Sequence, residues 1–194
     1  MFRTENDDGD YTYHGRWLFF LPRQTIDEGG ATGSNAEMYK AWYDEGHLIA
    51  AGQKEINDSE VWNHIHTICR KHSVEQVAFD NNRLGGMRHN IERYYPERHF
   101  KVFGSADSLT YPMEKTEGVI KSGRFVWHNN PIVNWCFGNC GIKESLGHQR
   151  RCLPVRGNPT LKIDGVISWL NGFKACLLYE EDVKAADLEA WYDD

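Results

Sequence analysis

Hydrophobic residues near the end of the chain recur at helical spacing. In TLKIDGVISWLNG, residues 160–172, and the residues that follow, one apolar stripe is formed by Ile163, Ile167, Leu170, Phe173 and Leu177. Steps of three and four predict a helix that packs one face against the core. Asp164 falls beside this stripe, and the small or polar residues Ser168, Asn171 and Ala175 follow it along the same edge. A polar or bulky group could therefore approach that edge.

Strand and helix patterns alternate through the rest of the chain. Apolar runs predict strands, or a hairpin arm in the first case, over residues 11–22, 74–80, 99–104 and 124–128, and helical spacing predicts helices over 35–46, 57–71, 83–95 and 106–123. Asn57 followed by Glu60 is a capping pattern. Residues 23–34 contain a double glycine without a following Gly-Lys-Ser/Thr, which indicates a loop and not a phosphate cradle. The alternation predicts an α/β fold.

Composition indicates one domain of ordinary size. The 194 residues are 40% hydrophobic and 13% aromatic, enough to bury one core. The N-terminus does not resemble a signal peptide and no apolar run approaches membrane-spanning length, so we expect no membrane and a cytoplasmic location. The five cysteines are an odd number, which favours reduced thiols over a disulfide framework.

The net charge of −6 is unevenly distributed. The acidic tail, residues 180–194, contains seven acidic residues and one lysine and accounts for the whole imbalance. The remaining body contains two basic stretches. The first is Lys143, Arg150, Arg151, Arg156 and Lys162, and the second is Arg83, Arg88, Arg93, Arg98 and Lys101. Each stretch is either a solvated surface, which is the ordinary case, or part of a groove that contacts DNA phosphates.

Two aspartates stand at positions that favour chemistry. Asp80 ends a short apolar strand, and ligands gather at the carboxyl ends of strands in α/β sheets. Asp164 begins the last helix. Taken singly, Asp80 is as well explained by a turn or a helix cap, and Asp164 by the positive end of the helix dipole, worth roughly 0.3–1 kcal/mol. If the two carboxylates meet, each raises the pKa of the other, and a bound divalent metal is the usual relief.

A second set of residues has metal-ligand chemistry but an irregular spacing. Cys136, Cys140, His148 and Cys152 follow the pattern C-x3-C-x7-H-x3-C, which is not a standard zinc spacing. Free cysteines are frequent in protein cores. A packing role for these cysteines is therefore favoured over zinc binding, and zinc binding is the alternative.

The order of several motifs resembles the C-terminal nuclease domain of the large terminase subunit of tailed bacteriophages, of prophage type. The matching stretches are FFLP (19–22), YKAWYDEGHLIAAGQ (39–53), VEQVAFDNN (74–82), LTYPMEKTEGVIKSGRFVWHNNPIVNWCFGNC (109–140) and LKIDGVISWLNG (161–172). They span nearly the entire chain. No single stretch is decisive, and their order makes the resemblance specific.

The resemblance implies an RNase H-like (RuvC-like) fold, with a central mixed sheet flanked by helices. It carries the family's second and third metal-binding acids over to Asp80 and Asp164, and implies Mg²⁺ or Mn²⁺ as the cofactor. It also divides the chain into a nuclease domain over residues 1–179 and the acidic tail, 180–194. Double-stranded DNA is the implied partner, with other terminase or portal components as further possibilities, in the cytoplasm of a bacterial host.

The sequence departs from the family's pattern at its beginning. The family's first acid lies on an opening strand of the form Gly-Xaa-Asp, which should precede residue 1, and the ATPase half is expected to be absent. Asp7, Asp8 and Asp10 belong to a predicted turn and do not replace that acid. Two functions follow as alternatives. One is a two-metal-type endonuclease that cuts concatemeric viral DNA, and the other is a catalytically silent remnant or binding module that keeps the fold.

Overall fold

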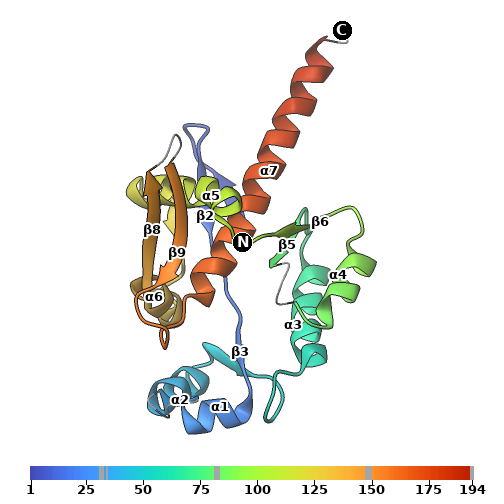
Figure 1. Ribbon diagram of the computed structural model, residues 1–194. Helices are drawn as coiled ribbons and strands as arrows, with labels where there is room; N and C mark the ends of the chain where they lie inside the picture. Colours follow the sequence, from blue (N-terminus) through green and yellow to red (C-terminus); the bar gives the residue numbers. More distant parts are fainter. Residues whose placement is uncertain (31–32, 34, 81–83, 147–149, 193–194) are drawn as a thin grey trace.

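The computed structural model describes residues 1–30, 33, 35–80, 84–146 and 150–192. The helices are α1 (Arg23–Glu28), α2 (Ala36–Asp44), α3 (Asp58–Lys71), α4 (Met87–Tyr94), α5 (Ala106–Lys121), α6 (Pro131–Gly138) and α7 (Asp164–Tyr192). The strands are β1 (Phe2–Glu5), β2 (Tyr11–His14), β3 (Phe19–Leu21), β4 (Leu48–Ala50), β5 (Val77–Asp80), β6 (His99–Val102), β7 (Phe125–Val126), β8 (Cys140–Leu146) and β9 (Arg150–Arg156). The α/β prediction is confirmed (Figure 1).

The described strands form four small sheets, and the sheet of β1, β2 and β7 is mixed. β1 pairs antiparallel with β2, which pairs parallel with β7. β3–β4 and β5–β6 are parallel pairs, and β8–β9 is an antiparallel hairpin. The strand that ends at Asp80, β5, has β6 as its only neighbour among the described strands. Such short strands have few ladder bonds, and helices provide much of their burial.

Helix α7 is the element around which the core is built. Trp169, Leu170 and Phe173 are 2% exposed or less. The ring of Trp169 packs against Phe125 of β7 at 4.4 Å between centroids, and that of Phe173 against Tyr13 of β2 at 4.9 Å. The burial of Ile163, Leu170, Phe173 and Leu177 confirms four positions of the predicted stripe, whereas Ile167 is half-buried. The two ring contacts fix α7 against the sheet of β1, β2 and β7.

The C-terminal half of α7 extends beyond the body of the molecule (Figure 1). The helix has 29 residues. Within it, the Glu180 carboxylate accepts a hydrogen bond from the Tyr13 hydroxyl at 3.1 Å and forms an ion pair with Arg3. The division of the chain at residue 179 stays a prediction, and α7 continues through it.

Helix α1 lies where a loop was expected. Pro22 precedes it with φ −60°, a value suited to a helix start, and Gly29 ends it with φ 77°. An ion pair between Arg23 and Asp27, at 3.0 Å, links successive turns. The completely buried side chain of Ile26 supplies the packing that a helix of six residues needs. The loop prediction was wrong because this packing depends on distant residues.

Capping residues define the ends of two other helices. The Asn57 side chain accepts hydrogen bonds from the Ser59 and Glu60 amides, as the capping pattern predicts for α3. Asn130 caps α6 in the same way, with Pro131 at the first helical position.

None of the described helices is both long enough and apolar enough to cross a membrane.

Candidate metal-binding site

A hollow of about 290 Å³ lies between β5 and α7. Its lining residues are Ala78, Phe79, Asp80, Leu84, Asp164, Ile167, Ser168 and Asn171. The two aspartates singled out from the sequence, which lie far apart along the chain, therefore line the same hollow. Both supply carboxylate oxygens to one concave surface.

The strand β5 places Asp80 at the rim of this hollow. Phe79 is 4% exposed and belongs to a small hydrophobic cluster with Trp62 of α3 and Ile91 of α4. Successive residues of a strand point to opposite faces, so burying Phe79 on that side leaves Asp80 directed away from it. Helix α7 packs on β5, and the half-buried Asp80 lies between the strand and the helix.

The start of α7 is set by close packing. The Ile163 carbonyl accepts hydrogen bonds from the Val166 and Ile167 amides, so the helix begins at Asp164. A methyl group added at Gly165 would lie 3.1 Å from Cβ of Cys136 on α6 and 3.2 Å from the ring of Phe19 on β3. The absence of a side chain at Gly165 therefore lets α7 approach both elements, which fixes where Asp164 stands.

Asp164 is exposed, and its negative charge acts on two buried groups. Burial raises the pKa of the Tyr39 phenol on α2 and of the Cys136 thiol, and the Asp164 carboxylate contributes in the same direction to both. Asp164 therefore stands near α2 and α6 as well as at the hollow. At the first turn of α7 its charge also lies at the positive end of the helix dipole.

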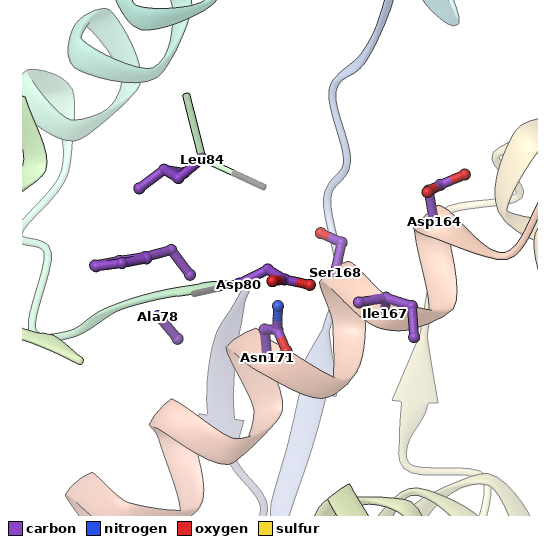
Figure 2. A pocket seen from close by; sticks show the side chains of 8 residues that line it. Ala78, Asp80, Leu84, Asp164, Ile167, Ser168 and Asn171 are labelled. Carbon is purple, nitrogen blue, oxygen red and sulfur yellow. The ribbon is translucent and has the colours of Figure 1, made fainter. Parts of the chain in front are cut away.

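Figure 2 shows how the polar side chains lie along the hollow. The Asp80 carboxylate lies beside Ser168 and Asn171, and Asp164 stands further toward the start of α7. These three α7 residues occupy the polar edge that the sequence predicts beside the apolar stripe. The sequence showed this edge but not that Asn171 is only 8% exposed.

The donor atoms of the hollow suit a hard divalent cation. They are carboxylate oxygens from Asp80 and Asp164, the Ser168 hydroxyl and the Asn171 carboxamide. Mg²⁺ and Mn²⁺ prefer oxygen ligands of this kind. Among the residues that the structure describes, no three His, Cys, Asp or Glu side chains gather as a metal-binding group. The hollow therefore offers two carboxylates to a cation, and a two-metal site would need a further acid.

The described cysteines do not form the alternative zinc site. Cys140 pairs with Arg156 across the β8–β9 hairpin, whereas Cys152 pairs with Glu144. Four residue steps along a strand separate the two thiols by about 13 Å, too far to share an ion with bonds of about 2.3 Å. Cys136 is buried against Gly165. His148 lies outside the described residues, and all five cysteines are free, as predicted.

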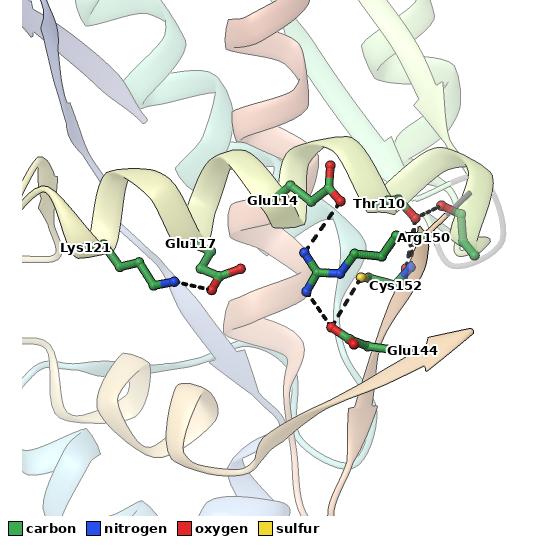
Figure 3. A network of polar contacts seen from close by, with 8 residues as sticks. Thr110, Glu114, Glu117, Lys121, Glu144, Arg150 and Cys152 are labelled. Atoms are coloured by element: carbon green, nitrogen blue, oxygen red, sulfur yellow. Dashed lines mark hydrogen bonds and ion pairs between the residues drawn. The ribbon is translucent and has the colours of Figure 1, made fainter. Parts of the chain in front are cut away.

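The first basic stretch lies mainly on the β8–β9 hairpin. Figure 3 shows the Arg150 guanidinium between Glu114 of α5, at 3.6 Å, and Glu144 of β8. The hydrogen bond from Arg150 to Glu144 raises the pKa of Arg150. Arg151 pairs with Asp107 of α5 at 3.2 Å. These two arginines therefore already have carboxylate partners, although their side chains are 42% and 58% exposed.

The other members of this stretch lie around the base of the hairpin and on β8. Lys143 is exposed on β8, and Arg156 is half-buried at the end of β9. Lys162 is exposed just before α7, where its carbonyl accepts a hydrogen bond from the Asn139 carboxamide at 3.1 Å. Lys162 is thus the member nearest in sequence to Asp164. In Figure 1 the hairpin and β5–β6 lie on opposite sides of α7.

The second basic stretch is spread over α4 and β6. Lys101 pairs with Glu92 at 3.8 Å, and Arg98 donates a hydrogen bond to the Val74 carbonyl at 3.0 Å. The Arg93 guanidinium lies 5.8 Å from the centre of the Tyr94 ring. Arg88 lies in the first turn of α4, and Arg83 lies outside the described residues.

The family described as "Terminase large subunit, endonuclease domain" matches residues 3–180, and the chain belongs to that family. The predicted resemblance is confirmed.

Two known proteins show the similarity in more detail. The chain is 24% identical to Protein YmfN of Escherichia coli (strain K12) over 191 residues, which cover 96% of the chain and 41% of YmfN. It superimposes on the crystal structure of the HK97 bacteriophage large terminase with a TM-score of 0.71 at 20% identity, over 89% of this chain and 35% of that one. The chain thus spans less than half the length of either protein. The structural match supports the predicted RNase H-like fold.

Proposed function

We propose that this chain is a metal-dependent endodeoxyribonuclease domain that hydrolyses phosphodiester bonds of double-stranded DNA, which in a phage would be concatemeric viral DNA. One observation carries the proposal: Asp80 and Asp164, to which the resemblance assigns the family's second and third acids, line a single hollow. Membership of the terminase endonuclease family supports the reaction class.

Asp80 and Asp164 would hold Mg²⁺ or Mn²⁺ in the hollow through their carboxylate oxygens. A divalent ion bound there activates water and stabilises the leaving oxygen of a phosphodiester. The carboxylates would fix the position of the ion between the strand end and the helix start. Ser168, which lines the hollow, offers a hydroxyl that can bind water or a phosphate oxygen.

DNA would be gripped through its phosphates. Lys143, Arg150, Arg151, Arg156 and Lys162 are the proposed contacts. Phosphate contacts carry no base information, so we expect weak, sequence-independent binding that falls steeply with salt. Other terminase or portal components are proposed as partners, in the cytoplasm of a bacterial host.

The number of carboxylates favours a second candidate function. Two-metal phosphodiesterases hold their ions about 3.5–4 Å apart. A shared carboxylate lowers the repulsion between two such dications, and the described lining of the hollow contains only two carboxylates. A binding module that keeps the fold without turnover would fit this count. We therefore expect at most one weakly held ion, and little or no cleavage by residues 1–194 alone.

Plasmid nicking with Mn²⁺ tests the proposal. We expect faint nicking by residues 1–194, stronger nicking when the family's opening strand and its aspartate are added at the N-terminus, and loss of this activity in Asp164→Asn. Robust nicking by the unextended chain that disappears in both Asp80→Asn and Asp164→Asn would show that two carboxylates suffice. Nicking that survives both substitutions would overturn the assignment of these two aspartates.

A further inference from the structure

Asn139 connects three elements at one point. It follows α6 directly and precedes β8. Its carbonyl accepts a hydrogen bond from the Gly157 amide at 3.3 Å, just after β9, and its carboxamide donates to the Lys162 carbonyl at 3.1 Å, just before α7. One half-buried residue therefore joins the end of α6 and the base of the β8–β9 hairpin to the segment that enters α7.

The chain is held by a side-chain hydrogen bond on each side of Asp164. Two residues before it, the Lys162 carbonyl is bound by Asn139. One residue after it, the Gly165 carbonyl accepts a hydrogen bond from Trp17 Nε1 at 3.0 Å. The two donors lie 23 and 148 residues away from their acceptors. These bonds therefore attach the start of α7 to the body of the molecule.

The two donors differ in what else they do. The ring of Trp17 packs against Trp169 at 6.0 Å and Phe125 at 6.4 Å between centroids, so Trp17 is also part of the hydrophobic core. The Asn139 side chain makes no other hydrogen bond to a residue that the structure describes. Lys162 is exposed, so water can replace the amide on its carbonyl. The contribution of Asn139 is therefore separable from the stability of the core.

We propose that Asn139 is a positioning residue for Asp164, and that its carboxamide holds the start of α7 where the Asp164 carboxylate reaches a cation bound by Asp80. This inference rests on the proposed function, because it assigns a support to one carboxylate of the same hollow. Bonds from Mg²⁺ to oxygen are about 2.0–2.1 Å long and the ion demands a near-ideal geometry. A small displacement of the helix start would therefore remove a ligand.

Asn139→Ala tests the role by removing the donor. Asn139 has helical backbone angles, φ −86° and ψ −10°, so alanine fits without strain. Calorimetric titration of residues 1–194 with MnCl₂ alone should show Mn²⁺ binding weakened by about tenfold, as loss of a supporting hydrogen bond at a metal site typically does. The melting temperature without metal should stay that of the parent chain. Asn134→Ala is the matched control, since Asn134 is exposed on α6 and makes no side-chain hydrogen bond to a described residue.

A double variant distinguishes positioning of Asp164 from a general structural role. If Asn139 acts through the Asp164 carboxylate, Asn139→Ala should cause no further loss of Mn²⁺ affinity in a chain that already carries Asp164→Asn, because the effects of coupled residues are not additive. A residue that supports the hollow as a whole would weaken binding by the same factor in both chains.

The results that would overturn the inference are distinguishable from failure of the proposed function. If Asp164→Asn weakens Mn²⁺ binding while Asn139→Ala binds as the parent does, Asn139 does not position Asp164 and the metal site itself stands. Equal losses with and without Asp164→Asn, or a lowered melting temperature of metal-free Asn139→Ala, would likewise make Asn139 a purely structural residue. If the parent chain binds no Mn²⁺, or if neither Asp80→Asn nor Asp164→Asn weakens binding, the proposed metal site fails and the positioning role fails with it.

Discussion

The hollow between β5 and α7 and the β8–β9 hairpin hold two groups of charged residues that the sequence marks out, and the two groups differ in how their charges are placed. In the hollow, two carboxylates from distant parts of the chain share one surface. On the hairpin, Arg150 and Arg151 are neighbours in sequence, and each already pairs with a carboxylate of α5. Two like charges in one hollow favour a bound cation, whereas paired arginines attract DNA phosphate less than unpaired ones.

The largest effect that this comparison predicts is on metal binding. Mn²⁺ at about 100 times its dissociation constant should stabilise the chain by about 2.7 kcal/mol, and Asp80→Asn or Asp164→Asn should remove most of this stabilisation. The double variant Arg150→Glu with Arg151→Glu should keep it, because these arginines lie on the hairpin. Thermal melts with and without Mn²⁺ measure the difference. If the hairpin variant loses the stabilisation by Mn²⁺ as fully as Asp80→Asn does, the assignment of metal binding to the hollow is contradicted.

The second effect concerns DNA. Arg150→Glu with Arg151→Glu should weaken binding to duplex DNA and reduce the slope of log affinity against log salt by less than about two, because about one per neutralised phosphate is the value for an unpaired arginine. Fluorescence anisotropy over a salt series measures both quantities.

Lys121→Glu is the control for this charge reversal, since Lys121 is an exposed cation on α5 that pairs with Glu117 at 2.6 Å and is not among the proposed contacts. Unchanged affinity in the double variant would assign the hairpin arginines to ordinary surface.

The smallest effect concerns the packing that supports each region. Gly165→Ala places a methyl group against Cys136 and Phe19. Overpacking typically costs roughly 1–3 kcal/mol, and replacing a helical glycine with alanine recovers up to about 1 kcal/mol, so we expect a net loss of about 1 kcal/mol.

Gly118→Ala is the matched control for this substitution. Gly118 lies on α5, which supports the hairpin, and nothing lies within 4 Å of the added methyl group. We expect this variant to be more stable by about 0.5–1 kcal/mol. Urea denaturation measures both changes. Equal effects of the two alanines would mean that α7 does not depend on the small residue at Gly165.

Local signals in the sequence were sufficient for much of the fold and for the candidate carboxylates. The Asn57 cap defines a helix start through bonds made within a few residues. The apolar stripe of α7 was readable because one face of a helix must be buried. Asp80 and Asp164 were identified by their places at a strand end and a helix start, together with the family's order of motifs.

Features that depend on distant contacts were not predictable in this way. Helix α1 forms because Ile26 is buried, and its six residues contain no strong signal of their own. The pairing of Arg150 and Arg151 with α5 follows from the β8–β9 hairpin, which the sequence did not reveal. The burial of Asn171 depends on where β5 crosses α7, and helical periodicity alone does not contain that information.

The most direct test of the shared hollow is anomalous X-ray scattering from crystals of residues 1–194 soaked in MnCl₂. The account predicts one manganese peak in the hollow, with oxygen atoms of Asp80 and Asp164 as ligands at distances close to those typical of Mg²⁺, about 2.0–2.1 Å. A peak elsewhere would contradict it, as would a structure in which the two carboxylates lie on opposite faces, more than about 12 Å apart, since no single ion with bonds of that length could join them.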